Sequence, residues 1–231
     1  DVRNVSIGYA GMFISKLKQV LRSAEKRGIE VNQAYKDYQV LKEEADNIYL
    51  TETELKQIEN VELTESLSNM RNLFLIGCYT GLRYSDFSRL TTDNIEGNNI
   101  RIRQQKTGDE VIIPLLSDYV KNLIINGNYR KISSQKLNEG IKEVCKRAGI
   151  IGKFMKTISK GGEKQTLIFN RWEKVSTHTA RRSFATNLFL RGVPSLSIMK
   201  ITGHHSETVF MKYIKIDKEQ NADLIKQQLN E

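Results

Sequence analysis

The chain has 231 residues, with 36 Lys and Arg against 27 Asp and Glu, and its formal net charge is +9 at pH 7. This length suits one large domain, or one and a half of ordinary size, and suffices for a hydrophobic core. The sequence contains no signal peptide and no apolar run near the ~20 residues of a membrane span. The charge favours a polyanionic partner only weakly, because many proteins are basic.

Apolar residues recur at helical spacing early in the chain and predict a helix. They are Ile14, Leu17, Val20, Leu21 and Ala24. Gly28 is a plausible helix end, and the polar stretch after it is expected to be a linker with partial helix. One helix and a partly helical linker bury little apolar surface by themselves. We therefore expect residues 1 to about 45 to be a docking appendage or the end of a domain that begins upstream. The start at Asp1 rather than Met agrees with a fragment of a longer protein.

The pattern changes near Leu50 to that of a mainly α domain with a small antiparallel β-sheet (α+β). Thr51 and Glu54 form a capping box before a short helix. A second helix is expected over about 64–79, with its stop at Gly81, and a third begins near Arg83.

Residues 99–115 show strand character, because isoleucines alternate with arginines before a turn at Thr107–Gly108–Asp109 and the apolar run VIIPL after it. A second hairpin is expected at 153–169, around Gly161–Gly162. Ser133 starts a helix that ends at Gly149.

The C-terminal third is predicted to be helical. A helix over 178–191 has the core stripe Ala180, Phe184 and Leu188, and Gly192 and Pro194 end it. Short helices follow, and a last one spans about 217–229.

The two cysteines, Cys78 and Cys145, lie in apolar stretches without CxxC spacing. They are expected to be buried, reduced thiols in a reducing compartment.

Four short polar stretches carry the residues with chemical potential. They are TGLRYSD (80–86), QQKTG (104–108), HTARR (178–182) and TGHHSETVFMKY (202–213). The candidates within them are Arg83, Lys106, His178, Arg181, His204 and Tyr213. Two arginines, a lysine, two histidines and a tyrosine can together grip a phosphodiester, move protons around it and attack it.

Each of these signals is weak when taken singly. Arg83 with Asp86 three residues later is also a common pattern for a solvated surface pair. Lys106 has the ordinary position of a turn lysine, and Tyr213 that of a tyrosine in an amphipathic helix. As a nucleophile, Tyr213 would gain from nearby arginines that favour the phenolate.

Two of these assignments have alternatives in neighbouring residues. Arg182 competes with Arg181 as a phosphate ligand, and we favour Arg181 because it shares a helix face with His178. His204 and His205 are adjacent, without i, i+4 spacing or a carboxylate cluster, so metal binding is not expected.

In this order and spacing, the four stretches resemble the tyrosine recombinase (phage integrase) family from about Thr51 to Tyr213. TGLRYSD resembles its first-arginine motif, HTARRSFATNL its His-x-x-Arg motif, and ITGHHSETVFMKY its Leu-Gly-His to Tyr segment. QQKTG matches the hairpin lysine, a less specific piece. Ile201–Thr202 replaces the usual Leu before Gly-His, which we take to be harmless, and the 153–169 hairpin is longer than in minimal members.

The resemblance implies a site-specific DNA recombinase or integrase that works through a 3′-phosphotyrosyl intermediate, without metal or cofactor. It implies that Arg83 and Arg181 bind the phosphate with help from His204, and that Asp86 supports Arg83. Tyr213 would be the nucleophile, His178 would assist its proton transfer, and Lys106 would protonate the departing 5′ oxygen.

The resemblance also implies the organisation and partners of the chain. Residues 1–45 would be the end of a helical core-binding domain plus linker, and 46–231 the catalytic domain with a tail helix. The tail is equally expected to pack on its own domain or on a neighbour. Double-stranded DNA and a tetramer of the chain are implied, with accessory DNA-bending or directionality proteins as further candidates. A mobile-element (phage or transposon) integrase in the bacterial cytoplasm is the expected type.

Three alternatives stay open. A type IB topoisomerase-like enzyme shares the nicking and resealing chemistry but needs no partner duplex. A non-catalytic basic DNA-binding module would leave the six chemical groups unexplained. A metal-dependent nuclease would need a cluster of carboxylates to bind its metal ions, and this sequence has none.

Overall fold

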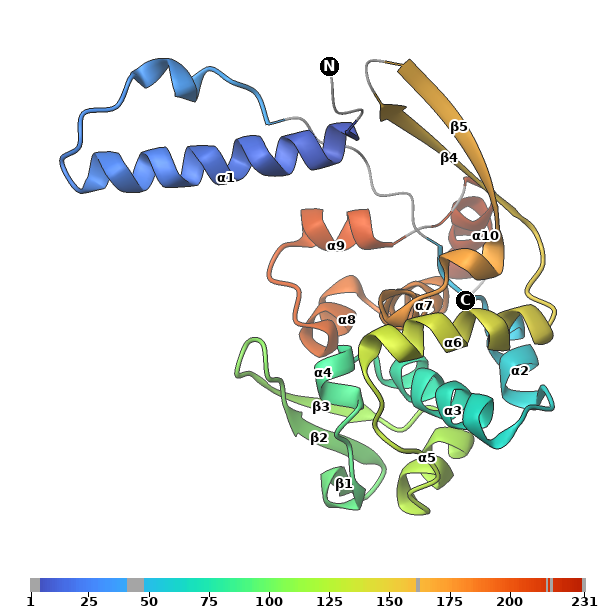
Figure 1. Ribbon diagram of the computed structural model, residues 1–231. Coiled ribbons are helices and arrows are strands. Elements are labelled where there is room, and N and C mark those ends of the chain that lie inside the picture. The colour runs from blue at the N-terminus through green and yellow to red at the C-terminus, as the bar shows by residue number, and fades with distance from the viewer. Residues whose placement is uncertain (1–4, 41–47, 161–162, 215, 217, 230–231) are drawn as a thin grey trace. The chain divides into compact units, whose positions relative to one another are not determined.

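The computed structural model of the protein describes residues 5–40, 48–160, 163–214, 216 and 218–229 (Figure 1). They divide into two compact units. The first comprises Asp1–Asp46 and Lys153–Phe169, and the second comprises Asn47–Gly152 and Asn170–Glu231. Within the described ranges, no helix has the length and apolar character needed to cross a membrane.

The first unit contains helix α1 (Ile7–Lys26), the 3-10 helix η1 (Gln33–Lys36) and the strands β4 (Lys153–Lys160) and β5 (Glu163–Asn170). The expected helix and its end are confirmed, since Gly28 has a positive φ of 78° just after α1. The second hairpin is also confirmed, but its glycine pair lies outside the described residues, and the strands group with α1 rather than with the second unit.

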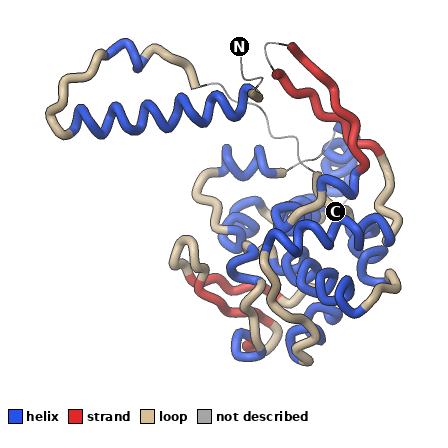
Figure 2. The backbone as a smooth tube through the Cα atoms, in the orientation of Figure 1, coloured by secondary structure: helices blue, strands red, loops and turns tan. Residues whose placement is uncertain are grey.

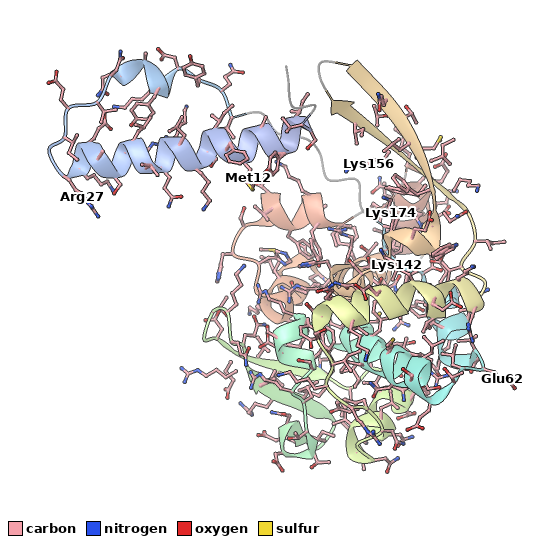
Figure 3. The ribbon with its side chains drawn as sticks, viewed as in Figure 1. Met12, Arg27, Glu62, Lys142, Lys156 and Lys174 are labelled. Atoms are coloured by element: carbon pink, nitrogen blue, oxygen red, sulfur yellow. The ribbon has the colours of Figure 1, made fainter. Side chains whose placement is uncertain are left out.

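Large apolar side chains of α1 remain exposed within the first unit. Met12, labelled in Figure 3, is 49% exposed, and Phe13 and Leu17 are similarly open. Within the described part of the first unit, the apolar side chains of this helix therefore have little cover. The buried Tyr35 donates its hydroxyl to Glu25 at 2.7 Å and ties η1 back to α1.

The second unit is mainly helical with one small sheet, which confirms the predicted class (Figure 2). Its helices are α2 (Glu52–Asn60), α3 (Glu65–Thr80), α4 (Tyr84–Phe87), α5 (Asp118–Ile125), α6 (Ser134–Arg147), α7 (Thr177–Leu190), α8 (Ser195–Thr202), α9 (Glu207–Tyr213) and α10 (Lys218–Leu229), with short 3-10 helices η2 (Thr92–Asn94) and η3 (Arg171–Lys174). The Thr51–Glu54 capping box is present. Helix α5 was not among the predicted elements.

The core of this unit is built around α3, which packs against α6 and α7. Four consecutive residues of α3, Leu73 to Ile76, are fully buried, so the C-terminal half of this helix packs against neighbours on all sides. Each such side chain contributes roughly 1.5–3 kcal/mol by leaving water. The helix ends at Gly81, whose φ of 65° turns the chain toward Arg83. A helix with an almost fully buried C-terminal half thus leads directly into the first polar motif.

The sheet has the order β1-β2-β3 and is antiparallel. Its strands are β1 (Ile95–Glu96), β2 (Asn99–Arg103) and β3 (Glu110–Pro114), of which β1 was not predicted. In β2 and β3, Ile100 pairs with Ile113 and Ile102 with Val111, and all four face the core. The predicted alternation is therefore confirmed, and the turn between β2 and β3 presents Lys106.

Long-range hydrogen bonds join the ends of the second unit. Ser183 and Asn187 of α7 bind the backbone N–H and carbonyl of Leu50 at 2.8 and 3.0 Å. Gln220 of α10 donates to the Tyr49 hydroxyl at 2.6 Å, and Leu224 is buried. In this single chain the tail helix therefore packs on its own unit, one of the two expected arrangements.

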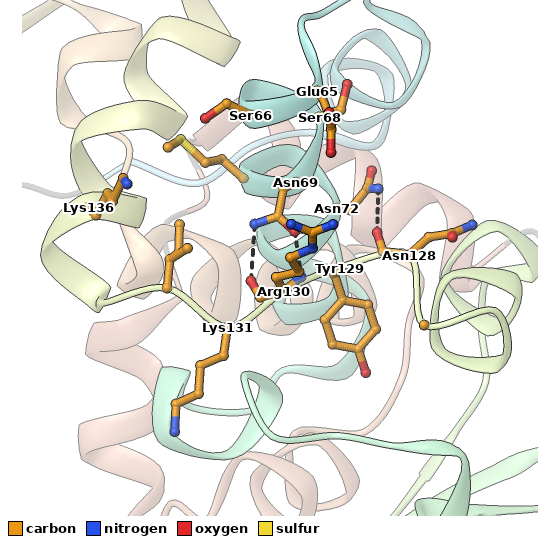
Figure 4. Close-up of a pocket in the computed structure, with 13 residues that line it drawn as sticks. Glu65, Ser66, Ser68, Asn69, Asn72, Asn128, Tyr129, Arg130, Lys131 and Lys136 are labelled. Atoms are coloured by element: carbon orange, nitrogen blue, oxygen red, sulfur yellow. Dashed lines mark hydrogen bonds between the residues drawn. The ribbon is translucent and has the colours of Figure 1, made fainter.

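A polar cavity of about 670 Å³ lies between α3 and the loop 127–132 (Figure 4). Asn69 and Asn72 of α3 donate to the loop carbonyls of Arg130 and Asn128 at 3.0 and 2.9 Å. None of the six candidate residues lines this cavity, so it is separate from their site.

The two cysteines are free and buried, as predicted. Burial raises the pKa of both Cys78 and Cys145, which keeps them protonated and unreactive at neutral pH.

Substitution of Gly81 by alanine tests the close approach of α3 to α7. A Cβ at Gly81 would lie 2.3 Å from Cδ1 of Phe184, in addition to the strain of a positive φ. We expect Gly81→Ala to lower the free energy of unfolding by about 2–5 kcal/mol, from about 1–2 of backbone strain and about 1–3 of overpacking. Urea denaturation measures the loss.

Gly97→Ala is the matched control, because Gly97 has a similar φ of 62° but no atom within 4 Å of the added Cβ. It should show only the strain of about 1–2 kcal/mol. Equal losses in the two variants would contradict the packing argument.

Candidate active site

The six candidate residues all lie in the second unit and come from four segments of the chain. Arg83 is the N-cap of α4, and Lys106 lies on the β2–β3 turn. The other four lie at the start of α7 (His178 and Arg181), just after α8 (His204) and at the end of α9 (Tyr213). The phenol of Tyr213 is 3.5 Å from the carbonyl oxygen of His178, and its ring centroid is 5.0 Å from that of His204.

Arg181 is a buried cation, only 5% exposed. Its Nη1 donates to the carbonyl oxygen of Gly81 at 2.8 Å, a neutral acceptor. Burial lowers the pKa of Arg181 to about 10, and nearby Arg83 acts in the same direction, yet the group stays charged at neutral pH. A buried charge without a full counter-charge is costly. The site is therefore electrostatically suited to an anion that approaches Arg181 and Arg83.

Gln104 holds Arg83 and was missed in the sequence. Its side chain is 1% exposed, and its Oε1 accepts from Nη1 of Arg83 at 2.6 Å. Its Nε2 donates to the carbonyl oxygen of Ile201 at 3.0 Å. One amide thus joins the first arginine, the β2–β3 hairpin and the end of α8. The strand alternation could have identified it, since Gln104 follows Ile100 and Ile102 on the inward face.

Asp86 is fully buried, but the described contacts of its carboxylate differ from the expected pairing with Arg83. Oδ1 accepts from the backbone N–H of Gln105 at 2.9 Å and lies 3.5 Å from Nη2 of Arg89. Asp86 therefore anchors the hairpin that carries Lys106. Its charge also offsets part of the effect of burial on the pKa of Arg181.

Tyr213 is partly buried and has charged and aromatic neighbours. Cζ of Arg182 lies 4.6 Å from its ring centroid, and Nε of Arg182 donates to its carbonyl oxygen at 3.2 Å. Burial raises the pKa of Tyr213, while Arg181, Arg182 and Arg83 act in the opposite direction. The arginines favour the phenolate as expected, but burial prevails. The phenol is therefore protonated at neutral pH, and its proton needs an acceptor when it attacks.

Two neutral imidazoles are available near this phenol. Partial burial lowers the pKa of His178, and Arg182 and Arg181 lower it further, as does the exposed Lys106 to a smaller extent. Burial, Arg181 and Arg83 lower the pKa of His204 to about 4. Both rings are uncharged at pH 7 and can accept a proton.

The described part of the chain contains no group of three or more His, Cys, Asp or Glu placed to hold a metal ion. The positive charge of the site comes instead from guanidinium groups. Arg182, which competed with Arg181 in the sequence, is occupied by the backbone and ring of Tyr213. Arg181 is thus the better placed of the two to receive an anion.

Residues 49–220 match the family model described as the phage integrase family. The tyrosine recombinase XerA of Pyrococcus furiosus is 23% identical over 218 residues, which cover 81% of this chain and 68% of that protein. A lambda integrase dimer bound to a COC′ core site has 18% identity and a TM-score of 0.64, with 92% of this chain and 76% of that chain covered. The Tn1549 transposon integrase in complex with circular intermediate DNA has 16% identity and a TM-score of 0.55, with 95% and 84% covered.

Replacement of Gln104 by leucine tests its role as a link. Gln104→Leu keeps the volume but leaves Arg83 and the carbonyl of Ile201 without their partner, so we expect the free energy of unfolding to fall by about 1–3 kcal/mol. Gln105→Leu is the control, because the Gln105 side chain is exposed and should change stability by less than about 0.5 kcal/mol. Equal effects in urea denaturation would count against the link.

The effect of Arg182 on the nucleophile can be measured by titration. Because its cation favours the phenolate, Arg182→Met should raise the pKa of Tyr213 further, whereas Arg182→Lys, which keeps a charge, should raise it less. The ¹³C resonances of labelled tyrosine, assigned with Tyr213→Phe, report the pKa. A lower pKa in Arg182→Met would contradict this arrangement.

Proposed function

The chain belongs to the phage integrase family, and we propose that it acts as a site-specific DNA recombinase with Tyr213 as the nucleophile. The observation that carries the proposal is the gathering of a partly buried phenol with two arginines that have no carboxylate partner among the described hydrogen bonds. A phosphodiester supplies the anion that these arginines require and the phosphorus that the phenol attacks.

Phosphate binding is the first step of the proposed mechanism. Arg83 and Arg181 bind the non-bridging oxygens of the scissile phosphate, and His204 adds a contact. A planar guanidinium can donate two parallel hydrogen bonds to phosphate oxygens, which fixes orientation as well as charge. The same groups stabilise the additional negative charge of the transition state, and they are positioned before the reaction begins.

The chemical step exchanges one phosphoester bond for another. The Tyr213 oxygen bonds to phosphorus as the bond to the 5′ oxygen breaks, which leaves a 3′-phosphotyrosyl link. The proton of the phenol passes to neutral His178, and Lys106 protonates the departing 5′ oxygen. A 5′ hydroxyl from a partner strand then attacks the link and releases Tyr213. The energy of the phosphodiester is conserved, so the cycle needs no ATP.

DNA is the proposed partner, and the proposed assembly is a tetramer on two duplexes. In solved structures with this fold, lambda integrase is bound to a core site as a dimer and to a Holliday junction as a tetramer. The net charge of +9 supports binding to a polyanion. We further propose that residues 1–45 are the end of a DNA-clamping domain and 46–231 the catalytic domain. Similarity to a transposon integrase supports a mobile-element role. Accessory proteins and a bacterial cytoplasmic location stay predictions.

Covalent trapping on nicked suicide duplexes tests the proposal. A pool with randomised sequence removes the need to know the target site, and EDTA removes divalent metals. We expect a denaturant-stable protein–DNA adduct from the native chain and none from Tyr213→Phe, because a phenyl ring has no nucleophilic oxygen. Tyr79→Phe, at a tyrosine of α3 outside the site, is the control and should form the adduct.

Three results would count against the proposal. An adduct from Tyr213→Phe would exclude this nucleophile, and loss of the native adduct in EDTA would exclude metal-free chemistry. Relaxation of supercoiled DNA with no joining of strands between duplexes would favour the topoisomerase-like alternative. DNA binding with no adduct from the native chain would favour the non-catalytic module.

A further inference from the structure

Thr202 stands where the family motif has its usual leucine before Gly-His, and the structure gives this hydroxyl a partner in the site. Thr202 is the last residue of α8 and is fully buried. Its Oγ1 is 2.8 Å from the carbonyl oxygen of Ile198 and 2.8 Å from Nδ1 of His204. The substitution therefore adds a polar contact to a histidine that the proposed function places at the phosphate.

The backbone around His204 is fixed as well. Gly203 adopts the left-handed conformation with φ 61°, and the N–H groups of Gly203 and His204 both donate to the carbonyl oxygen of Met199. A Cβ at Gly203 would lie 3.1 Å from Oε1 of Gln104, the amide that holds Arg83. The position and orientation of the His204 ring are thus set by the end of α8 and by one hydroxyl.

The protons of this contact can be assigned by counting. A threonine hydroxyl has one proton, and an O···O distance of 2.8 Å to a carbonyl requires a proton between the two oxygens. That proton is therefore directed at Ile198, and Oγ1 offers only lone pairs to His204. The 2.8 Å contact on the ring side then requires the proton on Nδ1. A neutral imidazole has one N–H, so Nε2 carries none.

We propose that Thr202 is a positioning residue that holds His204 as the Nδ1–H tautomer, so that His204 donates to a phosphate oxygen through Nε2 only after it takes up a proton. This inference rests on the proposed function for the identity of the anion. A leucine at this position has no oxygen to accept from Nδ1, and the ring could then donate from Nε2 while neutral. The threonine thus makes phosphate binding by this histidine dependent on pH.

The surroundings of His204 explain how the anion controls this proton. Arg181 of α7, Arg83 at the start of α4 and His205 face the ring as cationic or titratable groups, and Tyr213 of α9 lies beside it. Without an anion, burial and these cations keep the ring neutral. A bound phosphodiester offsets the two arginines and adds a negative charge, so it raises the pKa of His204.

The sign of the pH dependence follows from this linkage. Because the pKa of His204 is about 4 in the free chain and higher in the complex, binding takes up a proton between these two values. In that interval, affinity falls by at most about tenfold for each unit of rising pH. Above the pKa of the complex, the contact from Nε2 is absent.

The tautomer can be observed directly by long-range ¹H–¹⁵N correlation of the histidine rings in the full chain without DNA. Spectra of His178→Gln and His205→Gln identify the His204 signals. At pH 7 we expect a protonated Nδ1 in the native chain and in Thr202→Ser, which keeps the hydroxyl. Thr202→Val has nearly the same shape without the hydroxyl, and its His204 should shift toward the Nε2–H form. A native ring with the proton on Nε2, or three identical spectra, would overturn the proposal.

The coupling to an anion can be tested with sulfate, a tetrahedral dianion that does not titrate between pH 4 and 8. Sulfate should raise the pKa of His204 in the native chain and in Thr202→Ser, and its affinity should fall as pH rises. In Thr202→Val the neutral ring can donate, so affinity should change by less than about twofold over the same range. Equal pH dependence in all three chains, or no effect of sulfate on His204, would overturn the proposal.

These spectra do not depend on DNA cleavage, so the two proposals can fail separately. A covalent adduct in the trapping assay together with an Nε2–H native ring would leave the recombinase intact and overturn the role of Thr202. When the adduct forms, its yield from the native chain should decline with rising pH by more than that from Thr202→Val. The same decline in both variants would overturn the role of Thr202.

Discussion

The guanidinium of Arg181 is buried against a backbone carbonyl, and the buried carboxylate of Asp86 is bound to the hairpin and to Arg89. Burial of a cation under these conditions has a cost that the folded chain must offset elsewhere. The offset comes from the apolar packing of α3 against α6 and α7, the helix from which Arg181 projects. The apolar interior thus stabilises the fold enough to keep the Arg181 cation buried before an anion binds.

The same core determines where the other segments of the site can lie. Helix α3 ends at Gly81 beside Phe184, which directs the following Arg83 toward Arg181. The side-chain amide of Gln104 accepts a hydrogen bond from Arg83 and donates one to α8. It therefore links three segments that are far apart in the sequence. Because each contact depends on the others, a change at one segment should be felt at all of them.

Much of the fold could be predicted from the sequence because its signals are local. The Thr51 capping box, the glycine after α3 and the alternation of Ile100 with Ile102 each depend on residues within one turn or strand. The grouping of β4 and β5 with α1 depends on long-range contacts, and no local signal encodes it.

The site shows the same division between local and long-range information. The motifs supplied the six candidate residues, but the partner of Asp86 was not predictable because the hairpin returns to it from elsewhere in the chain. The acidity of Tyr213 was not predictable either, since burial and three cations act on it in opposite directions. A motif comparison shows only that Thr202 replaces a leucine and gives no reason to expect an effect. Only the geometry gives its hydroxyl two partners.

The β4–β5 hairpin leaves the second unit after Gly152 and returns at Arg171, and the backbone N–H of Arg171 donates to the Gly152 carbonyl at 2.9 Å. Arg171 also holds Glu54 and the carbonyl of Tyr49, so the base of the excursion is pinned on both sides. A segment whose two ends are held together can lengthen, shorten or be exchanged while the rest of the second unit keeps its shape. Gly152 and Arg171 therefore mark the two points between which this hairpin can be replaced by another segment while the second unit keeps its fold.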